Sequence, residues 1–345
     1  MAFLRIRGRL PGASSRARAG VANVACATLM GVCAGVPAPG VVASGASGAS
    51  SGPAAVPIST LSAELASAFV PDIEVVRLPL AQLVGALPPG PTLRLYAITD
   101  QPGLYVMHAP SLAAQGAMFS RVVALIERRD MPHDRVVSMS AVAANARRFG
   151  EDPAGLTAGN NFSAAQIAQF FEVAQRQRAS LTEGERALQA LLTRWGLIHR
   201  EAGATGEGGT TWRAASSRDF LVTIPGMGKG PAGEVIDAQV RAAILSHELG
   251  HWRFFSDPAY AHACRTFWWH QLTHTEREAL TGELAGMGYD PSDRIVIDEM
   301  QAYLLHTPAR FMPLADQPGA GGVDIARVKR GLELSVRNAG RNAGQ

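Results

Sequence analysis

Two histidines and a glutamate stand close together in the segment His247-Glu248-Leu249-Gly250-His251. On an α-helix, residues four positions apart share a face, so both imidazoles would point the same way and could bind one Zn²⁺ from adjacent turns. Glu248 would lie beside the metal, where a carboxylate can take a proton from a metal-bound water. The spacing therefore predicts a zinc centre able to activate water.

The flanking sequence favours a helix at this motif. Asp237 can cap its first turn, and Pro258 ends the pattern shortly after the motif. Apolar residues and the two histidines recur at intervals of three and four, at Val240, Ile244, His247, His251, Phe254 and Phe255. This pattern predicts a core helix whose buried side carries both imidazoles. The alternative is an amphipathic helix whose histidines only form hydrogen bonds, but that leaves Glu248 unexplained.

Catalytic zinc usually has three protein ligands and a water, so a third ligand is needed. We expect Glu299, on a helix predicted from Pro291 and Asp293 to His306. On a regular helix Glu299, Tyr303 and His306 share one face, as a ligand with two supporting polar groups would. The alternative is that Glu299 is a surface acid like its neighbour Asp298.

Asp257 is the main rival as third ligand, because it follows His251 at the distance that a third ligand takes in the metzincin pattern. That pattern needs a glycine where this chain has Phe254, so the helix would carry Asp257 past the metal. Weaker candidates are Glu278, Glu283, His262, His270 and His274.

The motif, followed at a distance by a helical glutamate, resembles the gluzincin branch of zinc metallopeptidases. The resemblance covers His247, Glu248, His251 and Glu299, and the interval from His251 to Glu299 is longer than in thermolysin-like members. The Asn-Glu-x-x-x-Asp signature of those members is replaced by Asp298-Glu299 with Tyr303. The resemblance implies a zincin core and metal-assisted hydrolysis, with no indication of a thermolysin-like specificity.

We therefore expect a zinc peptidase that holds one Zn²⁺ and acts on a peptide or protein substrate. Zinc on His247, His251 and Glu299 would lower the pKa of its water toward about 7. Glu248 would accept the proton and pass it to the leaving amine. Tyr303 or His306 could stabilise the oxyanion, although Tyr303 also suits a helix core. The alternatives are a non-catalytic zinc-containing binding protein of the cell envelope and a zinc hydrolase of a non-peptide bond.

The first 43 residues read as a secretory signal peptide. Five arginines in the first twenty residues precede an apolar run at 21–36 and the small residues Val41-Val42-Ala43. An uncleaved anchor is an alternative. A lipoprotein attached at Cys33 is another, although the residues before Cys33 match a lipobox poorly.

Residues 44–58 predict a flexible spacer. We expect a periplasmic or secreted protein with no integral membrane domain after the signal, since no later run of eighteen apolar residues appears.

Composition supports a folded protein, with 47% hydrophobic and 18% charged residues. The formal net charge of +3 becomes negative once the five N-terminal arginines are left out, so the basic pI does not indicate nucleic-acid binding. Only Cys264 follows the signal, which excludes an intrachain disulfide in the mature chain and indicates a buried thiol.

The remaining pattern predicts an α+β fold in which helices dominate, with a small sheet before the metal helix. Residues 59–215 would form an N-terminal α+β region of unassigned family, and 216–340 a mostly helical catalytic region. The strand at 219–224 could offer an open edge to an extended peptide. Phe267-Trp268-Trp269 could line the cleft or simply pack.

Predicted strands lie at 73–78, 92–99 and 104–108, with a turn at 101–103 between the last two. Capping boxes at Ser163/Gln166 and Thr182/Glu185 predict two helices. A short helix is expected at 61–69 and further helices at 275–286, 293–306 and 324–337. The segment 118–129 is ambiguous between helix and strand, as is 135–139. Residues 201–210 are expected to form a loop. The glycine-rich residues 225–230 favour a turn over a phosphate loop.

Overall fold

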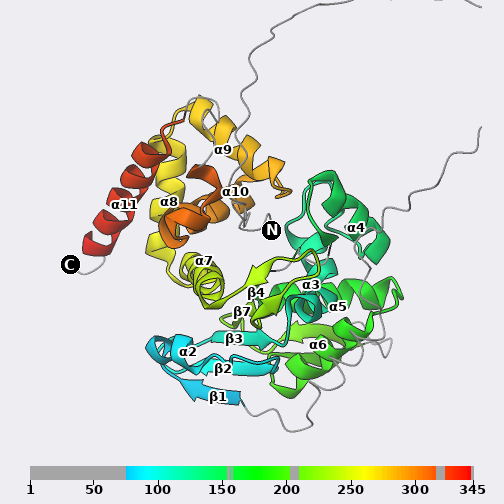
Figure 1. Ribbon diagram of the computed structural model, residues 1–345. Coiled ribbons are helices and arrows are strands. Elements are labelled where there is room, and N and C mark those ends of the chain that lie inside the picture. Colours follow the sequence, from blue (N-terminus) through cyan, green and yellow to red (C-terminus); the bar gives the residue numbers. More distant parts are fainter. Residues whose placement is uncertain (1–74, 154–155, 157, 203–209, 316–322, 343–345) are drawn as a thin grey trace, which may run out of the picture. The chain divides into compact units, whose positions relative to one another are not determined.

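The computed structural model describes residues 75–153, 156, 158–202, 210–315 and 323–342, which all belong to one packed unit (Figure 1). The predicted signal peptide, spacer and helix at 61–69 lie outside the described residues and stay predictions. No helix among the described residues has the length and apolar character needed to cross a membrane.

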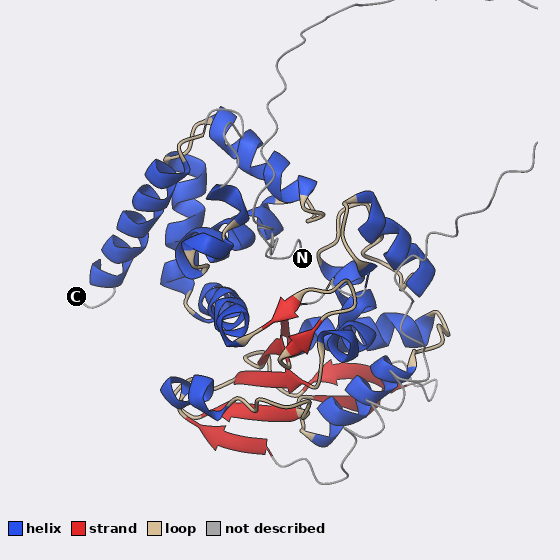
Figure 2. Ribbon diagram, in the orientation of Figure 1, coloured by secondary structure: helices blue, strands red, loops and turns tan. Residues whose placement is uncertain are grey.

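A mixed five-stranded sheet forms the base of the described structure (Figure 2). Its strands, in spatial order, are β1 (Val75–Leu78), β2 (Arg94–Ile98), β3 (Leu104–Ala109), β7 (Phe220–Pro225) and β4 (Asn160–Ser163). The predicted hairpin between β2 and β3 is confirmed, with Leu95 opposite Met107 in an antiparallel register. Gly103 in its turn has a φ of 89°, a conformation that glycine adopts without strain. The sheet combines strands from both predicted regions, since β7 follows residue 215 and the other four strands precede it.

The prediction that residues 219–224 form an open edge is wrong. β7 pairs in parallel with β3 and antiparallel with β4, so both of its sides are occupied. All six of its residues are buried, as a central strand requires. Within the described part of the chain, β4 is the edge strand on this side of the sheet and β1 the edge strand on the other. The short sequence of β4, Asn-Asn-Phe-Ser, has too little apolar character to predict a strand.

Helices cover both faces of the sheet because its strands alternate their side chains. Leu95, Met107 and Leu221 pack on one face with helices α3 (Leu112–Ile126), α5 (Ala164–Arg176) and α6 (Glu183–Arg194). Both predicted capping boxes are present, at the starts of α5 and α6. The ambiguous segment 118–129 is mostly helix α3.

The opposite face of the sheet carries helix α7 (Ala238–Ser256). Val106, Val222 and Ile224 of the strands share a core with Val240 and Ile244 of this helix. Asp237 caps α7 as predicted, through its side chain to the amides of Gln239 and Val240. The other side of α7 contacts the C-terminal helices, so the helix is buried between two layers (Figure 1).

The C-terminal helices surround an aromatic core of their own. They are α8 (Pro258–His270), α9 (His274–Gly286), α10 (Asp293–Gln301) and α11 (Ile325–Asn342). Phe267 and Trp268 lie in this core, which favours the packing interpretation of the aromatic run. Cys264 is a buried free thiol, as expected. Helix α8 was missed because Pro258 was read only as a stop, whereas proline also suits the first turn of a new helix.

Smaller elements complete the structure. They are α2 (Leu80–Ala86), α4 (Met139–Arg148), β5 (Ile198–Ala202), β6 (Thr210–Ala214), β8 (Gly228–Lys229), β9 (Val235–Ile236), a π-helix (Ala302–His306) and two 3₁₀ turns (Ala309–Phe311 and Pro313–Ala315). β5 and β6 pair with each other, so residues 201, 202 and 210 of the expected loop belong to strands, and its residues 203–209 lie outside the described residues. Together the elements confirm an α+β fold dominated by helices.

Candidate metal centre

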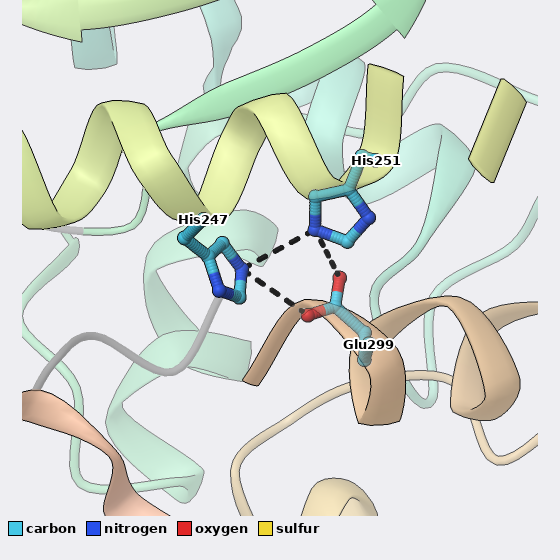
Figure 3. Close-up of side chains that lie close together, drawn as sticks. All are labelled: His247, His251 and Glu299. Atoms are coloured by element: carbon cyan, nitrogen blue, oxygen red, sulfur yellow. Dashed lines mark hydrogen bonds and ion pairs between the residues drawn. The ribbon is translucent and has the colours of Figure 1, made fainter. Parts of the chain in front are cut away.

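Three buried side chains converge where α7 meets α10. Figure 3 shows His247 and His251 on successive turns of α7, facing Glu299 of α10. The Nε2 atoms of the two histidines are 3.2 Å apart. The glutamate oxygens lie 3.6 Å from Nε2 of His247 and 3.7 Å from Nε2 of His251. This group can bind a metal ion, and it contains the two histidines and the third donor that the sequence predicted.

These distances fit a tetrahedral metal ion. Ligand atoms about 2 Å from a tetrahedral zinc lie about 3.3 Å from one another, close to the 3.2 Å between the two Nε2 atoms, and each Nε2 has a different oxygen of Glu299 within 3.7 Å. Oε2 of Glu299 is buried and has no hydrogen-bond partner among the described residues. A buried carboxylate oxygen left in this way is costly without a cation.

The outer nitrogens of both imidazoles are held so that the inner nitrogens face the centre. Nδ1 of His251 is 2.8 Å from Oδ1 of Asp298, and Nδ1 of His247 is 2.9 Å from the Thr307 hydroxyl. That hydroxyl donates to the carbonyl of Ala302, so it accepts from His247. With both Nδ1 atoms donating, the Nε2 lone pairs are directed at the centre, as metal ligation requires.

Electrostatics couple the three donors. Burial alone would lower the pKa of His251, but Asp298 and Glu299 raise it to about 10. Burial would raise the pKa of Glu299, yet the neighbouring His251 and His247 bring it below its usual value. Without a metal the group therefore holds a proton on His251, which a metal ion must displace.

Glu248 lies on the β4 side of the same helix. Its Oε2 accepts a hydrogen bond of 2.8 Å from Nδ2 of Asn161 in β4. The backbone of Gly159 comes so close that a Cβ there would lie 2.1 Å from Oε1 of Glu248. Burial raises the pKa of Glu248, which brings this carboxyl closer to the range of a base at neutral pH.

Tyr303 lies next to the donor group, as expected. Its ring centroid is 4.6 Å from that of His247, and its hydroxyl is 3.0 Å from the hydroxyl of Tyr289. Burial raises the pKa of Tyr303 well above its usual value, so the phenol keeps its proton. A neutral phenol can act as a hydrogen-bond donor, and the role of Tyr303 in stabilising an oxyanion stays a prediction.

His306 is outside the group of three donors found among the described residues. Its Nε2 is 3.0 Å from the hydroxyl of Tyr260, and its ring covers Gly250. The expected shared face assumed a regular α-helix through residue 306, but residues 302–306 form a π-helix. The wider turn of a π-helix changes the direction in which His306 points. This position favours packing, and a catalytic role for His306 stays a prediction.

Asp257 occupies the junction between α7 and α8, where its side chain accepts from the amide of Tyr260. It caps α8 and is outside the donor group. The described residues contain one group of three metal-binding donors, and none of the weaker candidates belongs to it. These are His262, His270, His274, Glu278 and Glu283, on α8 and α9.

Four residues around the centre were missed or misjudged from the sequence. Asn161, Gly159 and Thr307 carry no motif, and their contacts join residues 60 or more positions apart. Asp298 suggests a surface acid by its sequence, but its carboxylate contacts Nδ1 of His251. Its position next to Glu299 in the chain is the one local signal for a carboxylate that supports a donor histidine.

No known protein family matches the chain, and no curated protein or solved structure is significantly similar to it. The interpretation of function therefore depends on the geometry of the site.

Proposed function

We propose that the protein is a zinc-dependent peptidase with a zincin-like, gluzincin-type active site. The observation that carries the proposal is the buried group of His247, His251 and Glu299, with a buried Glu248 next to His247 in the same helix. A purely structural zinc site has no use for an additional buried base. Zinc is favoured over harder cations because two imidazoles and one carboxylate form the donor set.

When bound, zinc would polarise the scissile carbonyl and lower the pKa of a water. We expect Glu248 to accept the proton of that water and to deliver it to the leaving amine. The amide of Asn161 donates to Oε2 of Glu248, so Oε1 is the oxygen expected to make this exchange. Tyr303 keeps its phenolic proton and is the candidate donor to the oxyanion.

A peptide substrate is favoured by the position of strand β4. Among the described residues β4 is one of the two edge strands of the sheet, and its Asn161 contacts Glu248. We expect an extended peptide to pair with the side of β4 that faces away from β7 and so to come close to Glu248. The predicted edge at 219–224 is thus replaced by residues 160–163.

Substitution of Glu248 by Gln tests the proposal. The purified chain should contain one zinc, and E248Q should retain it while hydrolysis of a quenched peptide library falls at least about 100-fold. The exposed Glu278→Gln is the matched control and should leave turnover unchanged. Each protein is assayed with and without a chelator.

The outcomes separate three classes of protein. A chain that binds no zinc refutes every zinc hydrolase. Zinc without turnover of any peptide, ester or amide indicates an envelope binding protein, and turnover of non-peptide bonds alone indicates a different hydrolase. Full activity in E248Q would refute the role of Glu248 as base.

A further inference from the structure

Two buried polar side chains near the metal centre have no part in the mechanism above. Gln301 is the last residue of α10, and Tyr260 lies in the first turn of α8. The Tyr260 hydroxyl donates to Oε1 of Gln301 at 2.8 Å. Neither residue belongs to the donor group, and buried polar groups that bond to one another in this way call for an explanation.

These two residues connect His306 to the ligand His251. Nε2 of His306 is 3.0 Å from the Tyr260 hydroxyl. At the other end, Nε2 of Gln301 is 3.0 Å from Oδ1 of Asp298, and the same oxygen is 2.8 Å from Nδ1 of His251. Four consecutive hydrogen bonds therefore join the π-helix to a metal ligand through α8 and α10.

Each bond in this chain of side chains has one possible direction. An ionised carboxylate only accepts, so the Gln301 amide turns its Nε2 toward Asp298 and its Oε1 toward Tyr260. Tyr260 gives its only hydroxyl proton to Gln301, so its oxygen accepts from Nε2 of His306. All the bonds thus donate toward one oxygen of Asp298, the oxygen that also accepts from His251.

This arrangement matters because Asp298 needs support. Its side chain is 27% exposed, so water competes for the carboxylate that orients His251. The bond from Gln301 ends on Oδ1, the same oxygen that accepts from Nδ1 of His251, and it therefore keeps this oxygen in place. Hydrogen bonds in a chain polarise one another, so the Tyr260 hydroxyl makes the Gln301 amide a stronger donor.

The ring of Tyr260 is held from two further directions. The guanidinium of Arg253 lies 4.1 Å from the ring centroid. The backbone amide of Tyr260 donates to the side chain of Asp257 at 3.0 Å. Tyr260 therefore gives the chain of hydrogen bonds a fixed point on α8.

We propose that three residues outside the donor group position the ligand His251 and raise its affinity for zinc: Tyr260, Gln301 and His306. They act by keeping Asp298 aligned with Nδ1 of His251, which directs the Nε2 lone pair at the centre. The inference rests on the zinc-dependent function proposed above and deepens it. It gives His306 a positioning role in place of the oxyanion contact predicted from the sequence.

Removal of the Tyr260 hydroxyl tests the inference in the full chain. Tyr260→Phe keeps the ring but breaks two bonds of the chain. Competition with a chromogenic chelator should show zinc affinity reduced about 5-fold in Tyr260→Phe and about 10-fold in Gln301→Met, which breaks the bond to Asp298 itself. Tyr96→Phe is the matched control, since its buried hydroxyl donates to the carbonyl of Ala86 at 2.9 Å, outside the chain. This control should bind zinc as the parent does.

A double-mutant cycle separates positioning from a general loss of stability. In an Asp298→Ala background the chain no longer reaches His251, so Tyr260→Phe should cause no further loss of zinc affinity. An equal loss in both backgrounds overturns the inference, as does parent-like affinity in a folded Y260F. Melting temperatures without zinc show whether Y260F and Y96F are equally folded, and Gln301→Met takes the place of Y260F in the cycle if Y260F is not.

These measurements keep the two proposals distinguishable because zinc affinity does not depend on turnover. Coupling between Tyr260 and Asp298 supports the inference even if no peptide is hydrolysed. Hydrolysis without this coupling leaves the peptidase function standing and removes the inference alone. His306→Phe should also lower zinc affinity, and a variant that only lowers kcat of the zinc-saturated chain would overturn the role given to His306.

Discussion

At the scale of single residues, the centre depends on how the outer nitrogens of its imidazoles are held. Asp298 accepts from Nδ1 of His251 and also from the side-chain amide of Gln301. The first bond directs the Nε2 lone pair of His251 at the centre of the donor group, and the second holds the Asp298 carboxylate in place. Asp298 is therefore a positioning residue that does not itself bind the metal.

Removal of Asp298 should weaken metal binding. We expect Asp298→Ala to reduce zinc affinity about 10- to 100-fold, since the imidazole loses its orientation and part of its basicity. Competition with a chromogenic chelator measures the affinity. The exposed Asp293→Ala on the same helix is the control and should leave it unchanged. Equal affinities in both variants would contradict the assignment.

At the scale of elements, α7 packs closely against the π-helix, and this contact fixes the position of the His306 ring. The hydroxyl of Tyr260 holds the His306 ring, and this ring packs directly on Gly250. Gly250 thus allows the two helices to approach closely, which a side chain would prevent. This close packing explains why a glycine stands between the two histidines, independently of any bound metal.

Gly250→Ala should destabilise the protein even though alanine is the better helix former. Its Cβ would lie 2.7 Å from Cδ2 of His306, and that ring cannot swing away without losing Tyr260. We expect a loss of about 1–3 kcal/mol in the free energy of unfolding. Urea denaturation measures it.

The control lies on α9, where a Cβ at Gly282 would meet nothing within 4 Å. Gly282→Ala should raise the free energy of unfolding by up to about 1 kcal/mol. If both substitutions stabilise the protein, the close contact between Gly250 and His306 is not present in solution.

At the scale of the whole molecule, α7 joins the core under the sheet to the aromatic core of the C-terminal helices. The stability of the sheet also depends on a neutral histidine. His108 of β3 is fully buried, and its Nδ1 donates to the carbonyl of Thr92 at 2.6 Å. Its Nε2 has no partner among the described residues, so a second proton there would be buried without an acceptor.

This histidine predicts a loss of stability in mild acid. Burial is the main cause that lowers the pKa of His108 from 6.5 to about 4, and Arg241 lowers it further. Between these values the unfolded chain binds a proton that the folded protein does not. The free energy of unfolding should therefore fall by about 2 kcal/mol from pH 7 to pH 5 on account of this residue.

Urea denaturation of His108→Gln at both pH values checks this expectation. The amide can still donate to Thr92 but does not titrate, so the difference between the two pH values should shrink by about 2 kcal/mol. The exposed His199→Gln should show the full difference of the parent chain. The same pH dependence in His108→Gln and the parent would contradict the prediction.

The sequence by itself determined the local features of the centre. The spacing of His247 and His251, the cap at Asp237 and the helix around Glu299 follow from periodicity and capping within one element. Such signals act over a few residues, and they also located the capping boxes, the β2–β3 hairpin and the α+β class. Glu299 could be inferred as the third member of the group because this needed only a carboxylate on a buried helical face.

Only the tertiary structure decided which strand forms the edge, where His306 points and what surrounds the donors. β4 displaces β7 from the edge through pairing between residues about 60 positions apart, which strand propensity does not encode. The π-helix at 302–306 carries His306, which contacts Tyr260, and Asn161 of β4 contacts Glu248 of α7. These features arise from contacts between distant segments, whose energies depend on the packing of the whole chain.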